Sequence, residues 1–163
     1  MISLTARFVR CDRAAAAAEM ALMTPLLLVL LFGGLEAGYF MYSQHEVLKG
    51  VRDGARYGSR QSFVDATCAT ITPAVVTAIQ EVTRTGQPSG GATRLPGWDN
   101  AEVTVTPTCP ATAVTTGIYK GAANAPQITV SADVPYPSLF RSLGLIDLNI
   151  KLRASQQTAV MGI

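Results

Sequence analysis

The stretch AAAAAEMALMTPLLLVLLFGGLEAGYFMY, residues 14–42, decides the fold of this chain. It is apolar almost throughout, and no charged residue lies between its two acids, Glu19 and Glu36. With a rise of about 1.5 Å per residue, a helix of this stretch is ~43 Å long, whereas roughly 20 apolar residues suffice to cross a bilayer core. We therefore expect a helix that spans a membrane and continues beyond it.

Glu19 lies just inside the apolar stretch, where an ionised carboxylate is costly and usually has a partner. One hypothesis is that a cation from another molecule neutralises it within the membrane. The alternative is that Glu19 lies at the level of the lipid headgroups or is protonated. Glu36 lies near the far interface, where it is either a second intramembrane assembly residue or a solvated carboxylate paired with charges on the side of Lys49.

Basic residues flank the apolar stretch on both sides: Arg7, Arg10 and Arg13 before it, and Lys49, Arg52, Arg56 and Arg60 after it. Their distribution therefore does not orient the span. The basic and apolar parts fit a secretory signal peptide, but the chain then continues as a helix instead of breaking at a small-residue cleavage site. The other two interpretations are a plain transmembrane anchor and a leader cleaved before an apolar run that is kept.

The rest of the 163-residue chain is long enough for one small domain. A net charge of +2 with 15% charged residues is too weakly basic to indicate nucleic-acid binding. Of the three cysteines, Cys11 precedes the apolar stretch, and Cys68 and Cys109 follow it. If the C-terminal part is exported, Cys68 and Cys109 are the natural disulfide pair and Cys11 stays reduced in the cytoplasm; the alternative is three inert thiols.

Capping residues predict the limits of the helices. The long helix is expected to end near Gly58. A second helix is expected to begin with Thr72 as its N-cap and Pro73 at its first position, and to end at Gly86. The alternative is an earlier start, with Asp65 as the cap.

Apolar and polar residues alternate in 102–106, 127–134 and 148–155, which predicts an antiparallel sheet with one face in water. The other face needs a helical cover. The predicted fold class is therefore α+β: a long N-terminal transmembrane helix and a small head whose second helix packs on a three- to four-stranded antiparallel sheet. The apolar connection 136–147 either tucks under the sheet or presents a contact patch.

Residues that carry enzyme chemistry are missing from the pattern. The single histidine, His45, lies on the polar continuation of the long helix, where we expect it to be exposed. No Cys or His pair has metal-ligand spacing, and the Gly-rich segment 86–91 lacks the Lys-Ser/Thr of a phosphate loop. Asp53 is expected to form an exposed ion cluster with its neighbours Arg52 and Arg56. We predict no catalytic residue, no metal, no cofactor and no small-molecule substrate.

Four segments together resemble a known family: the basic leader with the alanine run into Glu19, LMTPLLLVLLFGGLE (22–36), VRDGARYGSR (51–60), and VPYPSLFRSLGL (134–145) followed by the strand LNIKLRAS (148–155). They look like the TadE/TadF-type pseudopilins of the tight-adherence (Flp, type IVb-like) pilus assembly system. The resemblance covers about residues 7–60 and 128–160. It implies, as partners, other pilins or pseudopilins and the pilus assembly machinery.

In such proteins a prepilin peptidase on the cytoplasmic face cuts between a small residue, normally Gly, and the residue four before the glutamate. The resemblance therefore places leader cleavage between Ala14 and Ala15, with Glu19 as the fifth mature residue. Ala14 stands where Gly is usual, and Met20 stands where Tyr or Phe often follows the acid. The new amine at Ala15 could meet the Glu19 of a neighbouring subunit within the membrane and set the register between them.

We therefore predict a non-enzymatic minor pilin or pseudopilin with three parts: a leader in 1–14, a membrane-spanning helix in 15–60 and an extracytoplasmic α+β head in 61–163. It lies in a bacterial inner membrane with its N-terminus in the cytoplasm, and it joins or primes a pilus through helix–helix contacts. The alternative is a permanently anchored envelope domain, with its leader uncut, that binds a partner through 135–146.

Overall fold

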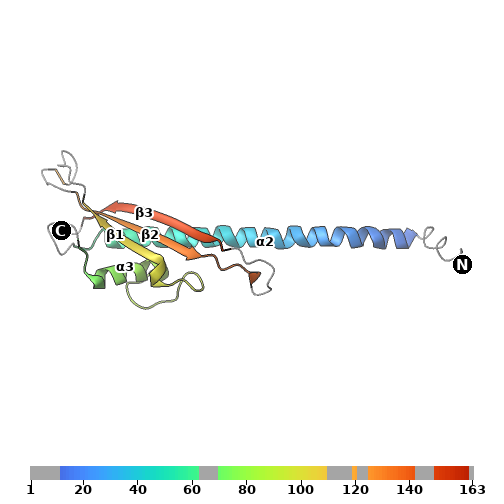
Figure 1. Ribbon diagram of the computed structural model, residues 1–163, viewed down its shortest axis with the longest axis horizontal. Helices are drawn as coiled ribbons and strands as arrows, with labels where there is room; N and C mark the ends of the chain where they lie inside the picture. Colours follow the sequence, from blue (N-terminus) through green and yellow to red (C-terminus); the bar gives the residue numbers. More distant parts are fainter. Residues whose placement is uncertain (1–11, 63–69, 110–118, 121–124, 142–148, 162–163) are drawn as a thin grey trace. The chain divides into compact units, whose positions relative to one another are not determined.

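A computed structural model describes residues 12–62, 70–109, 119–120, 125–141 and 149–161 of the chain. The elements are α2 (Asp12–Gly58), α3 (Pro73–Thr85), the 3-10 helix η1 (Asn100–Glu102), β1 (Val103–Thr108), β2 (Gln127–Pro135) and β3 (Lys151–Ala159) (Figure 1). The predicted α+β fold class, with a long apolar N-terminal helix, a second helix and an antiparallel sheet, is confirmed. The chain divides into two compact units, one ending at Tyr39 and the other, the head, beginning at Phe40.

The alanine run at the start of α2 favours a helix because alanine has the highest helix propensity. Pro25 cannot donate a backbone hydrogen bond, yet α2 continues through it. Next to it, the hydroxyl of Thr24 donates a 2.6 Å hydrogen bond to the carbonyl oxygen of Met20, so this polar side chain is satisfied within its own helix. The helix ends at Gly58, as expected.

Helix α3 begins at Pro73 and is followed by Gly86, the two limits that the capping residues predicted. Gly86 has a φ of 83°, in the left-handed region that glycine adopts without strain, and its N–H donates to the carbonyl oxygen of Val82 at 2.8 Å. Thr72 occupies the N-cap position, but its side chain makes no capping hydrogen bond. The alternative cap, Asp65, lies outside the described residues.

The three described strands form one antiparallel sheet in the order β1-β2-β3. β1 and β2 lie close to their predicted ranges, 102–106 and 127–134. The third strand was predicted at 148–155 but lies at 151–159. The reason is its pairing with the whole of β2, from Gln127 opposite Ala159 to Pro135 opposite Lys151. Ile150 precedes the strand and is 36% exposed.

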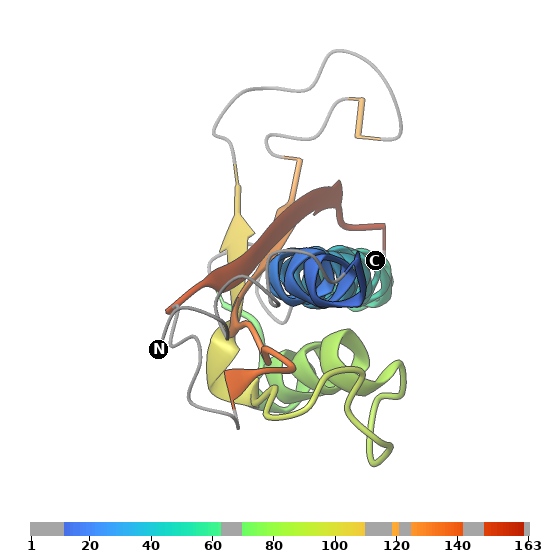
Figure 2. The same cartoon turned by 90° about the vertical axis from the view of Figure 1, so that its right-hand side faces the viewer.

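One face of the sheet is buried and the other faces water, as the alternation in β2 predicted. Figure 2 shows the C-terminal part of α2 and α3 on the same side of the sheet. The core between these layers consists of buried apolar side chains from α2, α3, the segment before η1 and the strands: Val47, Val51, Ala55, Ile79, Val82, Leu95, Trp98, Val103, Ile128, Val130, Ala132, Val134 and Leu152. The last turns of α2 are therefore part of the head.

Three glycines spaced by four residues let α2 approach α3 closely. A Cβ built on Gly50 collides with the carbonyl oxygen of Thr83, and one on Gly54 collides with the hydroxyl of Thr83. A Cβ on Gly58 comes within 2.9 Å of the Ile128 side chain. Thr83 is fully buried, and its hydroxyl donates to the carbonyl oxygen of Ile79 at 2.8 Å. A larger residue at Gly50 meets the backbone of α3 and therefore has to push the two helices apart.

One ion pair and one side-chain hydrogen bond fasten the segment between α3 and β1. Arg94 binds Asp53 of α2 at 2.6 Å, so the predicted cluster of Asp53 with its helix neighbours Arg52 and Arg56 is wrong. The reason is that Arg94 folds back onto α2 and offers the carboxylate a partly buried guanidinium. In α3, hydrogen bonds from Arg84 and then Asn100 hold the pKa of Glu81 below its ordinary value.

The connection after β2 was predicted either to tuck under the sheet or to form a contact patch. Tyr136 is buried, and its ring packs edge-on against Phe40 with the ring centroids 5.2 Å apart. Leu139, three residues later, is 48% exposed. The start of the connection therefore packs into the head at Tyr136, while Leu139 is exposed; residues 142–148 lie outside the described part.

We expect Gly50→Ala to destabilise the head by roughly 1–3 kcal/mol, because the added methyl group meets backbone of α3 that cannot rotate away. The matched control is Gly34→Ala in the same helix, where a Cβ meets nothing within 4 Å. Urea unfolding followed by the fluorescence of Trp98, the single tryptophan and fully buried, measures the difference. Equal midpoints for the two variants would contradict the close approach.

Candidate functional site

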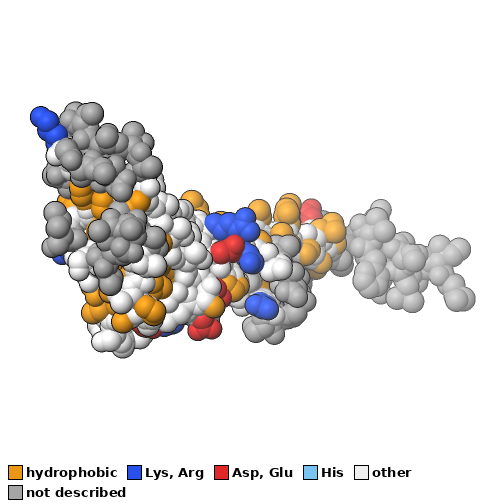
Figure 3. All heavy atoms as spheres, turned by 60° about the vertical axis from the view of Figure 1, so that its left-hand side comes forward, with side chains coloured by type: hydrophobic (Ala, Val, Ile, Leu, Met, Phe, Trp, Pro, Cys, Tyr) orange, Lys and Arg blue, Asp and Glu red, His pale blue; other side chains and the backbone are white. Residues whose placement is uncertain are grey.

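The candidate site is the apolar part of α2. The helix Ala15–Gly58 is long and apolar enough to cross a membrane, judged by length and composition. Before Tyr39, its leucines and its one valine are exposed, with Leu22 at 78% and Val29 at 69%. Figure 3 shows hydrophobic side chains at the surface of this helix. A helix that is apolar on all sides and uncovered by its own chain fits a lipid environment.

The structure places the two predicted assembly acids on α2 without bringing them together. Glu19 is exposed and Glu36 is half-buried. They are separated by 17 residues in the chain, or ~25 Å along a helix, close to the thickness of a hydrocarbon core of about 30 Å. Glu36 interacts with another group of the chain. Glu19 thus lies at one end of the apolar run and Glu36 at the other.

Three glycines near the end of the apolar segment leave room for another helix to approach α2 closely. A Cβ built on Gly33, Gly34 or Gly38 meets no atom within 4 Å. In contrast, Gly50 and Gly54 are covered by α3. Close helix–helix approach in membranes commonly uses glycines spaced by four, as Gly34 and Gly38 are. Glycines of α2 therefore contact α3 inside the head, whereas the glycines in the apolar segment contact no other described part of the chain.

The other predicted site residues are only partly described. Ala14 and Ala15, the predicted cleavage pair, lie in the first turn of α2, and Ala15 is exposed. Cys109 is disulfide-bonded. Its predicted partner Cys68, and Cys11, lie outside the described residues, so the pairing of Cys68 with Cys109 stays a prediction.

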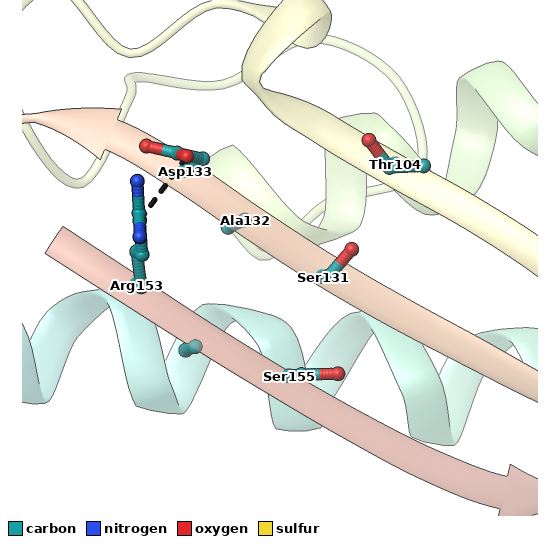
Figure 4. Close-up of a pocket in the computed structure, with 7 residues that line it drawn as sticks. Thr104, Ser131, Ala132, Asp133, Arg153 and Ser155 are labelled. Atoms are coloured by element: carbon teal, nitrogen blue, oxygen red, sulfur yellow. Dashed lines mark ion pairs between the residues drawn. The ribbon is translucent and has the colours of Figure 1, made fainter. Parts of the chain in front are cut away.

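A hollow on the water-facing side of the sheet is a site-like feature of the head that the sequence did not indicate. It has a volume of about 490 Å³ and is lined by Thr104, Ser131, Ala132, Asp133, Arg153, Ala154 and Ser155 (Figure 4). Asp133 is held by Arg153 at 3.2 Å and by Lys151 at 3.4 Å. The hydroxyl groups that line the hollow have no histidine beside them, because the single histidine, His45, is exposed on α2. Among the described residues, no group of three His, Cys, Asp or Glu side chains could hold a metal ion.

Comparison with known proteins gives one match. A family model described as TadE-like protein matches residues 14–56, which make up most of α2. No curated protein matches the chain, and no solved structure does. The C-terminal part of the resemblance, residues 128–160, therefore stays a prediction. Over residues 14–56, the resemblance to TadE-like proteins that the sequence indicated is confirmed.

Proposed function

We propose that this protein is a membrane-anchored pseudopilin that supports assembly of a tight-adherence pilus. The observation that carries the proposal is the apolar helix of residues 15–42, which its own chain leaves exposed and which bears Glu19 near its start. The match of residues 14–56 to the TadE-like family supports a role in such pilus systems. In this proposal the protein does not catalyse a reaction; α2 makes the contacts, and the head is its extracytoplasmic part.

The proposed first step is removal of the leader by a prepilin peptidase, between Ala14 and Ala15. Both residues lie in the first turn of α2, so the cut leaves a helix that starts with a free ammonium group. In an assembled state, that ammonium of one subunit meets the Glu19 carboxylate of its neighbour within the membrane. Breaking such a buried pair strands one charge and costs about 3–5 kcal/mol, so the pair sets the register between subunits.

Glu36 is the second residue that we propose for assembly. It marks the far end of the apolar run, next to the aromatic residues Tyr39, Phe40 and Tyr42, which are of the kind found at membrane interfaces. Because Glu36 already interacts with another group of its own chain, we expect it to contribute less than Glu19.

Sequencing the N-terminus of the protein purified from membranes tests the cleavage. We expect the sequence to begin at Ala15, and Ala14→Gly to be processed in the same way, because both are small residues. A bulky residue, as in Ala14→Leu, should leave Met1 in place. A wild-type protein that still begins at Met1 would instead favour a permanent anchor.

Replacing Glu19 tests the intramembrane pair. We expect Glu19→Ala to reduce the amount of pilin or pseudopilin captured by cross-linking in membranes at least tenfold, since about 1.4 kcal/mol corresponds to tenfold and a stranded buried charge costs more. Glu46→Ala, which removes the same charge from the head part of α2, is the control. If both variants capture wild-type amounts of partner, the charge pair has no role in assembly.

The orientation that we propose puts the head outside the cytoplasm, where disulfides persist. Cys109 is disulfide-bonded, and we propose Cys68 as its partner, with Cys11 left reduced on the leader side. Peptide mapping without reductant should find the Cys68–Cys109 cross-link, and Cys11→Ala should leave it unchanged. A cross-link to Cys11 would contradict both the pairing and the orientation.

The alternative function is a permanently anchored binding or scaffold domain. In this alternative the contact surface is the connection after β2, residues 135–146, where Leu139 is 48% exposed. Two results together would support this alternative over the pilus proposal: an N-terminus that is not cut, and partner capture that Glu19→Ala leaves unchanged.

A further inference from the structure

The outer edge of β3 has an orientation that two hydrogen bonds define. In an antiparallel ladder, the N–H and C=O of one residue point to the same side, and the sides alternate along the strand. The N–H of Val160 donates to the carbonyl oxygen of Pro126 at 2.9 Å, which continues the pairing with β2 through even-numbered residues. The side-chain amide of Gln44 donates to the carbonyl oxygen of Arg153 at 2.9 Å from outside the sheet. The odd-numbered residues of β3 therefore direct their backbone groups away from β2.

Only the ends of this edge are closed. Gln44 of α2 covers Arg153, and the N–H of Met161 donates to the carbonyl oxygen of Ser59 at 2.6 Å. Between them, the described part of the chain supplies no partner for the backbone groups of Ser155 and Ala159 or for the N–H of Gln157. Residues 155–157 are also exposed on both faces of the strand. This is an unpaired strand edge of the kind that another chain can extend.

The opposite edge of the sheet, on β1, is protected. The side-chain amide of Gln80 donates to the carbonyl oxygen of Val103 at 3.0 Å, which places Val103 and the alternate residues Val105 and Pro107 on the outer side. Pro107 has no N–H to offer an added strand. The two edges thus differ: at β1 the carbonyl oxygen of Val103 is taken and Pro107 has no N–H, whereas the middle of β3 keeps its N–H groups open in the part of the chain that the structure describes.

A groove runs along the open edge, on the side that faces α2. It has a volume of about 370 Å³, and its walls include Arg52 and Arg56 of α2 and Ser59, which follows the helix, together with Gln156, Thr158 and Met161. Figure 4 shows α2 passing alongside β3. Gln156 stands on the inner face of the sheet, opposite Val130, but is exposed. An added strand would direct every second side chain into this groove.

The groove is positively charged. Arg52 and Arg56 are exposed, form no ion pair among the described residues, and repel each other one turn apart on α2. The adjacent acid, Asp53, is bound to Arg94. The rise between the two arginines is about 6 Å along the helix, and alternate side chains of a strand are about 6.7 Å apart. Acids two positions apart on an added strand would therefore each meet one arginine.

We propose that the open edge of β3 binds an extended acidic segment of another protein as a fourth strand. The segment's backbone pairs with Ser155, Gln157 and Ala159, and two acids spaced by two residues face Arg52 and Arg56. Strand addition of this kind obtains affinity from main-chain hydrogen bonds and specificity from alternate side chains. The segment comes from another protein, because no two of the 11 acids in this chain are two positions apart.

The test uses the full-length protein in detergent micelles and a labelled ten-residue peptide in which Glu alternates with Val and Thr, with binding followed by fluorescence anisotropy. We expect the double variant Arg52→Gln/Arg56→Gln to bind this peptide roughly tenfold more weakly, since each exposed ion pair contributes modestly. Lys49→Gln/Lys120→Gln removes the same charge elsewhere and should keep the wild-type affinity. Equal affinities for the two double variants would overturn the assignment of the groove.

The backbone contacts are tested first from the peptide side, where a folding defect of the protein cannot imitate the result. Two versions of the peptide carry N-methyl groups on alternate amides, in opposite registers; we expect only one to lose binding, by roughly tenfold or more. Gln157→Pro should weaken binding while Gln157→Thr does not, since only proline removes the N–H that faces the peptide. If both methylated peptides bind like the parent, or vesicles of phosphatidylglycerol compete for the arginines while the proline has no effect, strand addition is wrong.

Discussion

The close approach of α2 to Thr83 of α3 is the contact on which the head depends. Glycines at 50 and 54 leave space for the backbone and side chain of Thr83, and the hydroxyl of Thr83 is satisfied within its own helix. Because the two helices touch through backbone there, Val47 and Val51 of α2 are fully buried with the strands. One helix therefore supplies an apolar surface in its first part and one wall of a packed core in its last turns.

That division explains why the same residue types have different surroundings along α2. Gly34 and Gly38 have nothing near them, whereas Gly50 and Gly54 are covered. Leucines before Tyr39 are exposed, whereas the valines after it are buried. In the first part of α2 the apolar side chains lie on all sides of the helix, as in a helix surrounded by lipid. In the last part they lie on one side, as in a helix that packs on a core. The pilus proposal assigns the first part to contacts with neighbouring subunits.

The sequence predicted what local chemistry decides and missed what distant partners decide. Pro73 and Gly86 define α3 through backbone preferences of single residues, and the alternation in β2 reports burial on one face. The limits of β3 were wrong because Gln156 and Gln157 carry no apolar signal, and pairing with β2 alone extends the strand to Ala159. Asp53 binds Arg94, 41 positions away, which no local pattern indicates. Glu19 was found from sequence because an isolated acid in an apolar run is itself a local signal, whereas an open strand edge exists only once the pairing of every strand is known.

The two recognition features proposed for this chain differ in the solvent that surrounds them, and this separates their roles. Glu19 loses its hydration in hydrocarbon, and this cost offsets most of the attraction to a cation, so the pair contributes little net affinity. A register between subunits that leaves Glu19 without a cation is strongly disfavoured. Arg52 and Arg56 remain exposed to water, where salt screens them within about 8–10 Å. They therefore attract an acidic segment without holding it tightly, and the main-chain pairing along β3 has to supply the affinity. A chain with both features can keep a fixed position among neighbours in the membrane while it exchanges partners at its head.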